Sequence, residues 1–119
     1  MVNKHGSLYT IGYSGFDIKV FIDVLRQLNI QIVIDVRSYP VSKYYTDYNK
    51  DILEKTLKKN HIFYKNYSAE FGARQEKPCF FSEEGYLDFS KFVLSDQFKT
   101  GFDKIVTGLD AGHSFALMC

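Results

Sequence analysis

The chain has 119 residues, which is the size of one domain and leaves no room for a second. Hydrophobic residues make up 45% of it, which is enough for an apolar core and excludes a disordered protein. Fifteen basic and fourteen acidic residues leave a formal net charge of +1, which excludes a strongly basic nucleic-acid coat and an acidic tail. This charge is still compatible with a local anion site.

Two cysteines, Cys79 and Cys119, are too few for a disulfide framework and lack the spacing of a metal site. The first residues contain no apolar signal segment, and no apolar run is long enough to span a bilayer. We therefore expect a cytoplasmic protein with no membrane partner, and the sequence points to no metal or other cofactor.

The first third of the chain predicts a βαβ unit. Residues 8–11 form a short apolar run that stops at Gly12 and predicts a buried strand. Asp17 is a suitable N-cap for a helix whose apolar stripe covers residues 18–28. Residues 31–36 form a continuous β-branched run, typical of a strand covered on both faces. Strand, helix and strand with short links predict a parallel sheet with a right-handed crossover.

A second helix and a third strand follow a polar and aromatic loop over residues 37–48. Asp47 or Asn49 caps the helix, which is predicted over about residues 50–59. Residues 61–64 predict the strand. Strands that alternate with helices extend the parallel sheet.

The rest of the chain predicts two helices and a final strand. Residues 66–84 show no regular period and predict an irregular segment, and aromatic residues predict a third helix near 86–93. A fourth helix opens at residue 95 or 96 and ends at Gly112, and residues 114–119 predict the last strand. The fourth helix is expected to turn four residues inward: Phe98, Phe102, Ile105 and Leu109. Together the elements predict a three-layer α/β/α fold around a mostly parallel sheet of about four strands.

Several residues that can carry chemistry follow the predicted strands. Ligands of open parallel sheets bind outside the carboxyl ends of the strands. That rule selects eight residues: Gly12, Tyr13, Ser14, Asp35, Arg37, Glu70, Arg74 and Cys119. We expect them to converge at one edge of the sheet, although they are far apart in the sequence.

Arginine is scarce in this chain, with three against twelve lysines, and its planar guanidinium binds phosphate or carboxylate in a way that lysine does not match. Arg37 and Arg74 are therefore the candidate anion-binding residues. The turn over residues 12–14 could add backbone N–H groups, although any tight turn before a helix looks similar. Arg37 could instead pair with Asp35, since a charge that ends a buried strand is costly without a partner.

Three residues are candidates for catalysis. Asp35 or Glu70 is the acid–base candidate, and Cys119 is a possible nucleophile if its thiol pKa is lowered. Each also has a structural interpretation: an ion pair for Asp35, a solvated loop charge for Glu70, and a small core residue for Cys119. Ser14 has no adjacent histidine, so a catalytic triad is not supported.

The loop after the second strand interleaves aromatic and basic residues, which suits the stacking of nucleobases. These residues are Tyr39, Lys43, Tyr44, Tyr45, Tyr48 and Lys50. A coding bias toward Lys, Asn, Ile, Tyr and Phe gives the same pattern, and the near-neutral charge argues against nucleic-acid binding. We favour the interpretation as coding bias.

Two paired motifs resemble the bacterial and archaeal family called domain of unknown function 488. They are the Thr-Ile-Gly-Tyr-Ser turn at residues 10–14 and the Asp-Val-Arg-Ser-Tyr-Pro segment at residues 35–40. Weaker matches lie at residues 70–74, 85–89 and 116–119. The resemblance implies a three-layer α/β domain and brings no settled activity with it.

Family members continue past the last strand with an acidic residue and a Cys-His-Arg segment. This sequence ends at Cys119, so we expect one domain over residues 1–119 that lacks the segment. The Ile-Asp-Val-Arg segment and the strand-ending cysteine also resemble rhodanese-like domains. In those domains a loop after the cysteine binds an anion, and that loop is absent from this sequence.

Three functions stay open at this point. The first is an enzyme, or the remnant of one, that binds an anionic and nucleotide-like small molecule at the carboxyl edge of the sheet. The second is a nucleic-acid-binding module that uses the tyrosine-rich loop. The third is a protein-interaction domain that self-associates through the last strand, which we expect to have an uncovered apolar face.

Overall fold

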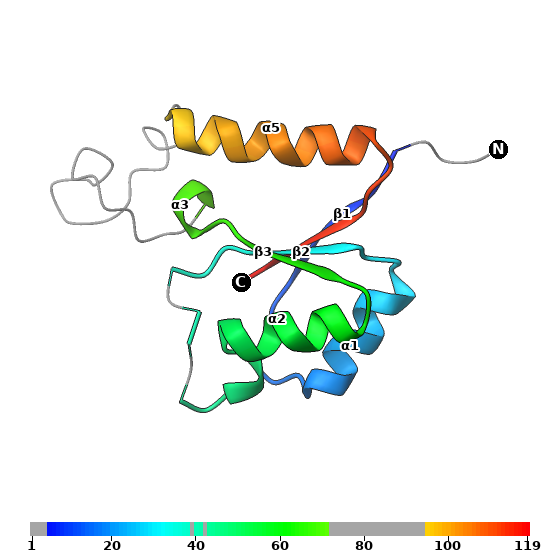
Figure 1. Ribbon diagram of the computed structural model, residues 1–119, viewed down its shortest axis with the longest axis vertical. Coiled ribbons are helices and arrows are strands. Elements are labelled where there is room, and N and C mark those ends of the chain that lie inside the picture. Colours follow the sequence, from blue (N-terminus) through cyan, green and yellow to red (C-terminus); the bar gives the residue numbers. More distant parts are fainter. Residues whose placement is uncertain (1–4, 39, 42, 72–94) are drawn as a thin grey trace, which may run out of the picture.

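A computed structural model describes residues 5–38, 40–41, 43–71 and 95–119. Among these residues a parallel sheet forms the middle layer, with helices α1 and α2 below it and helices α3 and α5 above it (Figure 1). This arrangement confirms the predicted three-layer α/β fold. The helix expected near residues 86–93 and the predicted site residue Arg74 lie outside the described residues.

Within the described ranges the sheet contains four strands, and these run in the same direction. They are β1 (Leu8–Ile11), β2 (Ile32–Asp35), β3 (Phe63–Asn66) and β4 (Phe115–Met118), and their order across the sheet is β1-β4-β2-β3. Leu8 and Ile32 both pair with Phe115, one on each side of β4. The carboxyl ends of all four strands therefore line one edge.

The last strand is central, and the expectation that it has an uncovered face is wrong. Phe115, Ala116 and Met118 are at most 5% exposed, since helices pack on both sides of β4. The exposed residues lie instead on the two edge strands: Leu8, Tyr9 and Thr10 of β1, and Phe63 and Lys65 of β3, face solvent. Self-association stays a prediction, and it would need another surface.

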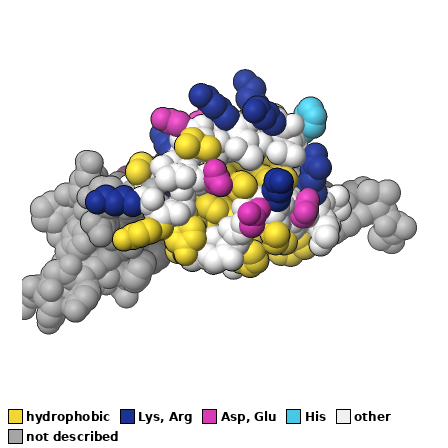
Figure 2. All heavy atoms as spheres, turned by 90° about the horizontal axis from the view of Figure 1, so that it is seen from below, with side chains coloured by type: hydrophobic (Ala, Val, Ile, Leu, Met, Phe, Trp, Pro, Cys, Tyr) yellow, Lys and Arg dark blue, Asp and Glu magenta, His cyan; other side chains and the backbone are white. Residues whose placement is uncertain are grey.

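Helices α1 (Ile18–Gln27) and α2 (Lys50–Lys59) cover one face of the sheet. Asp17 caps α1 as predicted, because its carboxylate accepts a hydrogen bond of 2.8 Å from the backbone N–H of Lys19. The short 3₁₀ helix η1 (Thr46–Tyr48) leads into α2. The main core lies beneath these helices and is built from Phe21, Ile22, Leu25, Ile30, Val33, Tyr48, Leu53, Leu57, Ile62, Ala116 and Met118. The outer surface of α1 and α2 mixes basic, acidic and hydrophobic side chains (Figure 2).

Helices α3 (Ser68–Phe71) and α5 (Asp96–Asp110) lie on the other face. The hydroxyl of Ser95 caps α5, and a smaller core forms beneath it from Ile34, Tyr67, Ile105 and Phe115. The predicted inward face of α5 is wrong at Phe102, which is 55% exposed, whereas Gly101 is buried. None of the described helices is long and apolar enough to cross a membrane.

Strands β2 and β4 are each one residue shorter at both ends than predicted, and two larger differences concern β3 and α3. The third strand begins at Phe63 instead of residue 61, because His61 has a φ of 60° and belongs to the turn after α2. Helix α3 occupies part of the segment that we expected to be irregular. Gly112, with a φ of 92°, follows the last turn of α5 as predicted.

Candidate functional site

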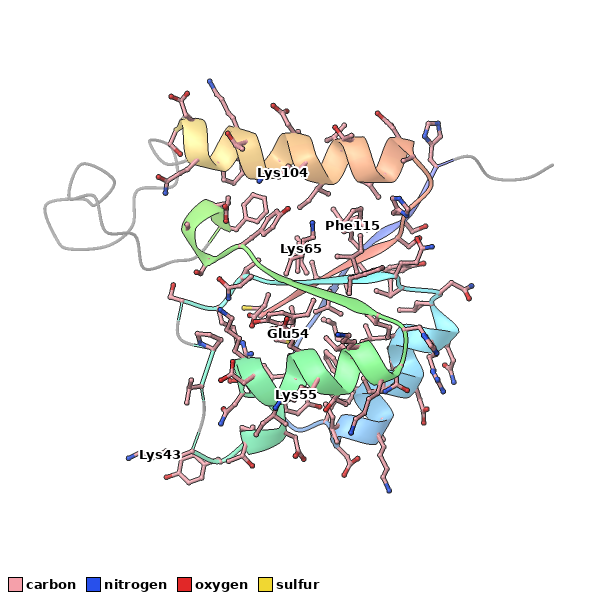
Figure 3. The ribbon with its side chains drawn as sticks, in the orientation of Figure 1. Lys43, Glu54, Lys55, Lys65, Lys104 and Phe115 are labelled. Atoms are coloured by element: carbon pink, nitrogen blue, oxygen red, sulfur yellow. The ribbon has the colours of Figure 1, made fainter. Side chains whose placement is uncertain are left out.

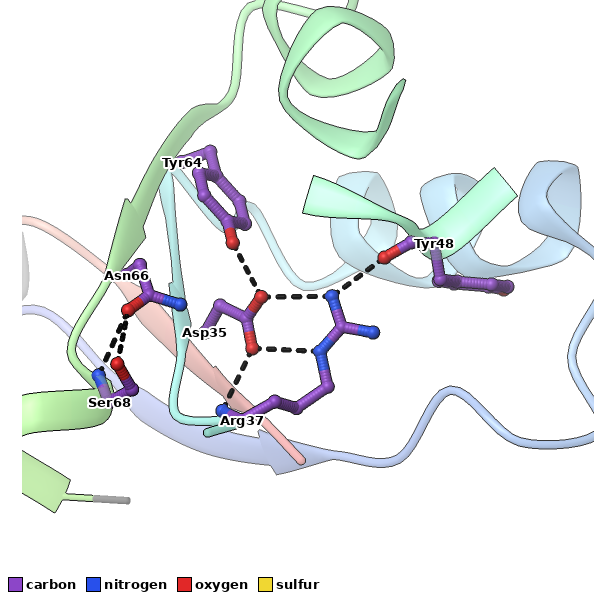
Figure 4. Close-up of polar contacts among 6 residues, drawn as sticks. All are labelled: Asp35, Arg37, Tyr48, Tyr64, Asn66 and Ser68. Atoms are coloured by element: carbon purple, nitrogen blue, oxygen red, sulfur yellow. Dashed lines mark hydrogen bonds and ion pairs between the residues drawn. The ribbon is translucent and has the colours of Figure 1, made fainter. Parts of the chain in front are cut away.

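Asp35 ends β2 and has no exposed surface. Its Oδ1 accepts hydrogen bonds from the backbone N–H (3.0 Å) and Nε (2.9 Å) of Arg37, and its Oδ2 accepts from Arg37 Nη2 (2.9 Å) and the Tyr64 hydroxyl (2.5 Å) (Figure 4). Four hydrogen bonds use the whole accepting capacity of a carboxylate. With no lone pair left for a substrate, Asp35 is better suited to positioning Arg37 than to acid–base catalysis.

The guanidinium of Arg37 is held from several sides. Its Nη2 also donates a hydrogen bond of 2.6 Å to the backbone carbonyl of Tyr48, and its Cζ lies 4.9 Å from the centre of the Tyr13 ring. The Arg37 side chain is only 8% exposed. Its Nη1 is buried and has no hydrogen-bond partner among the described residues. Unpartnered buried donors are rare in native proteins, and an ordered water or a ligand commonly accounts for them.

The protonation states of Arg37 and Tyr64 are fixed by their surroundings. Burial lowers the pKa of the Arg37 guanidinium, but the hydrogen bonds and charge of Asp35 outweigh that effect and raise it. Burial, followed by the hydrogen bond to Asp35, raises the pKa of Tyr64. Arg37 is therefore a permanent cation, and Tyr64 remains a neutral donor at physiological pH.

Tyr13 is the centre of an aromatic cluster that closes over Arg37. Its ring lies 5.7 Å from that of Tyr45 in an edge-on contact, and 5.1 Å from that of Tyr48. Tyr48 packs edge-on against Phe21 and is only 2% exposed. The loop after β2 thus folds back onto the sheet edge instead of standing free in solvent.

The tyrosines that we considered as a stacking platform differ in how exposed they are. Tyr48 belongs to the core, and its hydroxyl donates a hydrogen bond of 2.7 Å to the carbonyl of Phe16. Tyr44 is 91% exposed and Tyr45 is 40% exposed. Tyr39 lies outside the described residues.

The turn after β1 and the end of β4 reach the same edge. The backbone N–H of Cys119 donates a hydrogen bond of 3.1 Å to the carbonyl of Ile11, so Cys119 lies beside the turn that begins at Gly12. Gly12, Ser14 and Cys119 are all exposed, and the Cys119 thiol is free. The structure therefore brings residues 12–14, Asp35, Arg37 and Cys119 to one edge, as the strand ends predict.

Glu70 is placed differently. It lies in α3, where its Cβ and Cγ sit close against Gly101 of α5, on the opposite face of the sheet from Arg37. A side chain packed between two helices is not aimed at the Asp35–Arg37 pair. The proposed catalytic role of Glu70 therefore gains no support from its position.

Two features of the site were not predicted from the sequence. Tyr64 pairs with Val33, and paired strand residues share a face of the sheet. Asp35 lies two residues after Val33 on the same face, so the Tyr64 hydroxyl can reach it. The backbone carbonyl of Tyr48 completes the clamp on Arg37. Knowledge of the register between β2 and β3 would have identified Tyr64. Every residue has a backbone carbonyl, so the sequence does not indicate which carbonyl accepts this hydrogen bond.

The location of the Asp35–Arg37 pair matches the general binding position of this architecture. The chain leaves β2 toward the face covered by α2, whereas it leaves β3 toward α3 on the other face. A place where the chain leaves neighbouring strands toward opposite faces is a topological switch point. Ligands of open α/β sheets bind at such a point, outside the carboxyl ends of the strands. Across the described ranges, no three His, Cys, Asp or Glu side chains are placed to hold a metal ion.

The fold and this edge define the class: an open parallel α/β domain with a buried aspartate–arginine pair at the switch between two strands. A family model described as Domain of unknown function DUF488 matches residues 17–119. Since this region is most of the chain, the protein belongs to that family. The matched region contains Asp35, Arg37 and β4, and it begins after the turn at residues 10–14. No curated protein and no solved structure matched the chain.

Proposed function

We propose that the domain binds a small anion, with nucleoside monophosphates as the best candidates, at the carboxyl edge of its sheet. The observation that carries this proposal is the buried Nη1 of Arg37, which has no acceptor among the described residues. A phosphate oxygen is a strong acceptor for guanidinium N–H groups. Asp35 and the Tyr48 carbonyl hold the other side of the guanidinium, so that the free side is oriented in advance.

The surroundings of Nη1 suggest how a ligand reaches it. The Tyr13 ring lies over the guanidinium, and the turn that carries it is exposed at Gly12 and Ser14. A rotation of Tyr13 would open Nη1 to an anion at that turn. The displaced ring, with Tyr45 beside it, would then offer an aromatic surface to the base of a nucleotide.

The charge balance sets the strength of binding. Asp35 neutralises Arg37, so the pair has no net charge and attracts an anion through hydrogen bonds more than through its field. We therefore expect weak binding, with a Kd of about 0.1–1 mM for a mononucleotide. The saturated carboxylate of Asp35 favours binding over acid–base chemistry as the function of this edge.

Side-chain nitrogen NMR tests the proposal directly. Titration with inorganic phosphate and with a nucleoside monophosphate should shift the guanidinium signals of Arg37 in a saturable way. Arg26, which is exposed on α1, is the internal control and should not shift. Arg37→Lys keeps the charge but removes Nη1, and it should weaken binding at least about tenfold, whereas Arg26→Lys should not. If the Arg37 signals stay fixed at saturating ligand, the proposal is wrong.

The tyrosine-rich loop supports a second candidate, binding of single-stranded nucleic acid. Tyr44 is 91% exposed, and the neighbouring Lys43 projects away from the domain (Figure 3). An exposed ring beside a positive charge can stack on a base. Fluorescence anisotropy of a labelled oligothymidylate at low salt tests this candidate. Tyr44→Ala should weaken binding about tenfold and Tyr9→Ala should not, and an equal effect of the two would rule the loop out.

A further inference from the structure

A groove of about 660 Å³ lies between α5 and the sheet, on the face opposite to Arg37. Ile32, Lys65, Tyr67 and Phe115 form its sheet side, and one side of α5 forms the other. Pockets of about 300–1,000 Å³ are the usual size for small-molecule sites. The groove is separate from the proposed anion site, because the sheet itself stands between them.

Charged and apolar groups are separated along this groove. Lys65 of β3 and Lys104 of α5 line its half near the carboxyl ends of the strands, where the Lys104 ammonium lies 5.8 Å from the centre of the Tyr67 ring. Ile32 and Phe115 begin their strands and form an apolar floor at the other half. Figure 3 shows Lys65, Lys104 and Phe115 in the space between α5 and the sheet.

Helix α5 carries small residues where it meets the apolar half, and it packs directly on part of the Phe115 ring, which is only 5% exposed. Gly108 lies directly over the Phe115 ring, where a Cβ would stand 2.4 Å from the ring atom Cζ. Ala111, one turn further along, also lines the groove. Beside Ile32, the paired residue Phe63 is 71% exposed, so the apolar surface continues past the groove onto β3.

The geometry points to a small organic monoanion with an aromatic body, such as an aryl carboxylate, as the ligand of this groove. The carboxylate would lie between Lys65 and Lys104, and the rings would lie on Ile32 and Ala111, beside the edge of the buried Phe115 ring. Asp103 also lines the groove and offsets one of the two lysine charges. This balance favours a monoanion over a phosphate dianion. At the apolar end, the Nδ1 atom of His113 lies 3.3 Å from the side-chain amide oxygen of Gln31.

The test uses 1-naphthoate and its neutral analogue 1-naphthalenemethanol, followed through the side-chain methyl signals of Ile32, Thr107 and Ala111. Naphthoate should shift these signals in a saturable way, and the alcohol should bind at least about tenfold more weakly. Lys65→Met and Lys104→Met keep most of each side chain's length and apolar surface, and each should raise the Kd about threefold to tenfold. Lys58→Met, on the exposed surface of α2, is the matched control and should leave the Kd unchanged.

A blocking variant separates binding in the groove from binding elsewhere. Thr107 is exposed and lines the groove, so Thr107→Phe should fill it and abolish binding without disturbing the core. Any one of three results overturns the inference: no saturable shift, equal affinity for the acid and the alcohol, or a concentration-dependent dimer that shifts the same methyl signals. Because the sheet separates the two sites, saturating naphthoate should leave the guanidinium signals of Arg37 unshifted whether or not the anion site at the sheet edge exists.

Discussion

The Tyr64 hydroxyl donates a hydrogen bond of 2.5 Å to Oδ2 of Asp35, and this bond joins the edge strand β3 to the end of β2. The same carboxylate accepts three hydrogen bonds from Arg37, one of them from its backbone. Asp35 therefore fixes the direction in which the chain leaves β2, the orientation of the guanidinium and the position of β3. A change to any of these three residues should therefore affect stability as well as binding at this edge.

Tyr64→Phe removes one hydrogen bond to a buried carboxylate and leaves the aromatic ring in place. We expect it to lower the free energy of unfolding by about 1.5–3 kcal/mol, since hydrogen bonds to charged groups are worth about that much. Urea unfolding followed by circular dichroism measures the change. Tyr9→Phe, on the exposed strand β1, is the control and should stay within about 0.5 kcal/mol of wild type. Equal effects of the two variants would contradict a specific role for the Tyr64 hydroxyl.

Arg37→Met should be the more damaging change, because it leaves the buried Asp35 carboxylate without its cation. Breaking a buried ion pair from one side typically costs about 3–5 kcal/mol. The double variant Asp35→Asn with Arg37→Met should lose less stability than the sum of the two single variants, with a coupling of about 0.5–3 kcal/mol. Strict additivity in a double-mutant cycle would show that the two side chains do not stabilise one another.

Stability should fall when the pH rises above about 10. Burial, reinforced by the charges of Asp17 and Asp47, raises the pKa of Tyr48 from 10.0 to about 12. Between these two values the unfolded chain loses the phenolic proton while the folded protein keeps it, so the contribution of Tyr48 is lost as the pH rises through this window. Tyr64 is shifted in the same direction.

Two measurements check this pH dependence. Tyrosinate absorbance should show the Tyr48 and Tyr64 hydroxyls ionising only after the exposed tyrosines. The urea midpoint of the Tyr48→Phe variant should fall less steeply with pH across the same window than that of wild type. A variant whose midpoint follows the wild-type slope would assign the pH dependence to other groups.

Gly108→Ala tests the contact between α5 and β4. Alanine normally favours a helix over glycine by about 1 kcal/mol. Here its Cβ would meet the Phe115 ring, with 2.4 Å to Cζ and 2.8 Å to Cε2. We expect a net loss of about 1–3 kcal/mol from overpacking. Gly12→Ala is the matched control, because no atom lies within 4 Å of its added Cβ. A stabilised Gly108→Ala variant would mean that Phe115 can move aside freely.

Local patterns were sufficient to predict most of the elements. The apolar stripe of α1 begins after a real N-cap at Asp17, and the expected range of α2 over residues 50–59 is confirmed. These features depend on neighbouring residues alone. His61 shows where local patterns fail, because the apolar run that follows it does not reveal that this residue turns with a positive φ.

The features that could not be predicted from the sequence depend on contacts between residues that are far apart along the chain. The Phe102 position fits the helical period of α5, but close contact of α3 with Gly101 turns that side of α5 inward and leaves Phe102 outside. The strand order could not be predicted either, because β2 and β4 are both continuous apolar runs that suit a central position. At the site, Asp35 and Arg37 were found by their place at a strand end, whereas Tyr64 depended on the register between two strands.

The central position of β4 has a consequence for how the chain folds during synthesis. Among the described strands, β1 and β2 do not pair with each other, and β1 meets the sheet only through β4, with Leu8 paired to Phe115 across 107 residues of sequence. A nascent chain that has not yet released Phe115 from the ribosome holds only the β2–β3 pair and an isolated β1. Such long-range pairing slows folding. The domain should therefore complete its sheet in one late step, when β4 inserts between two strands that were made much earlier.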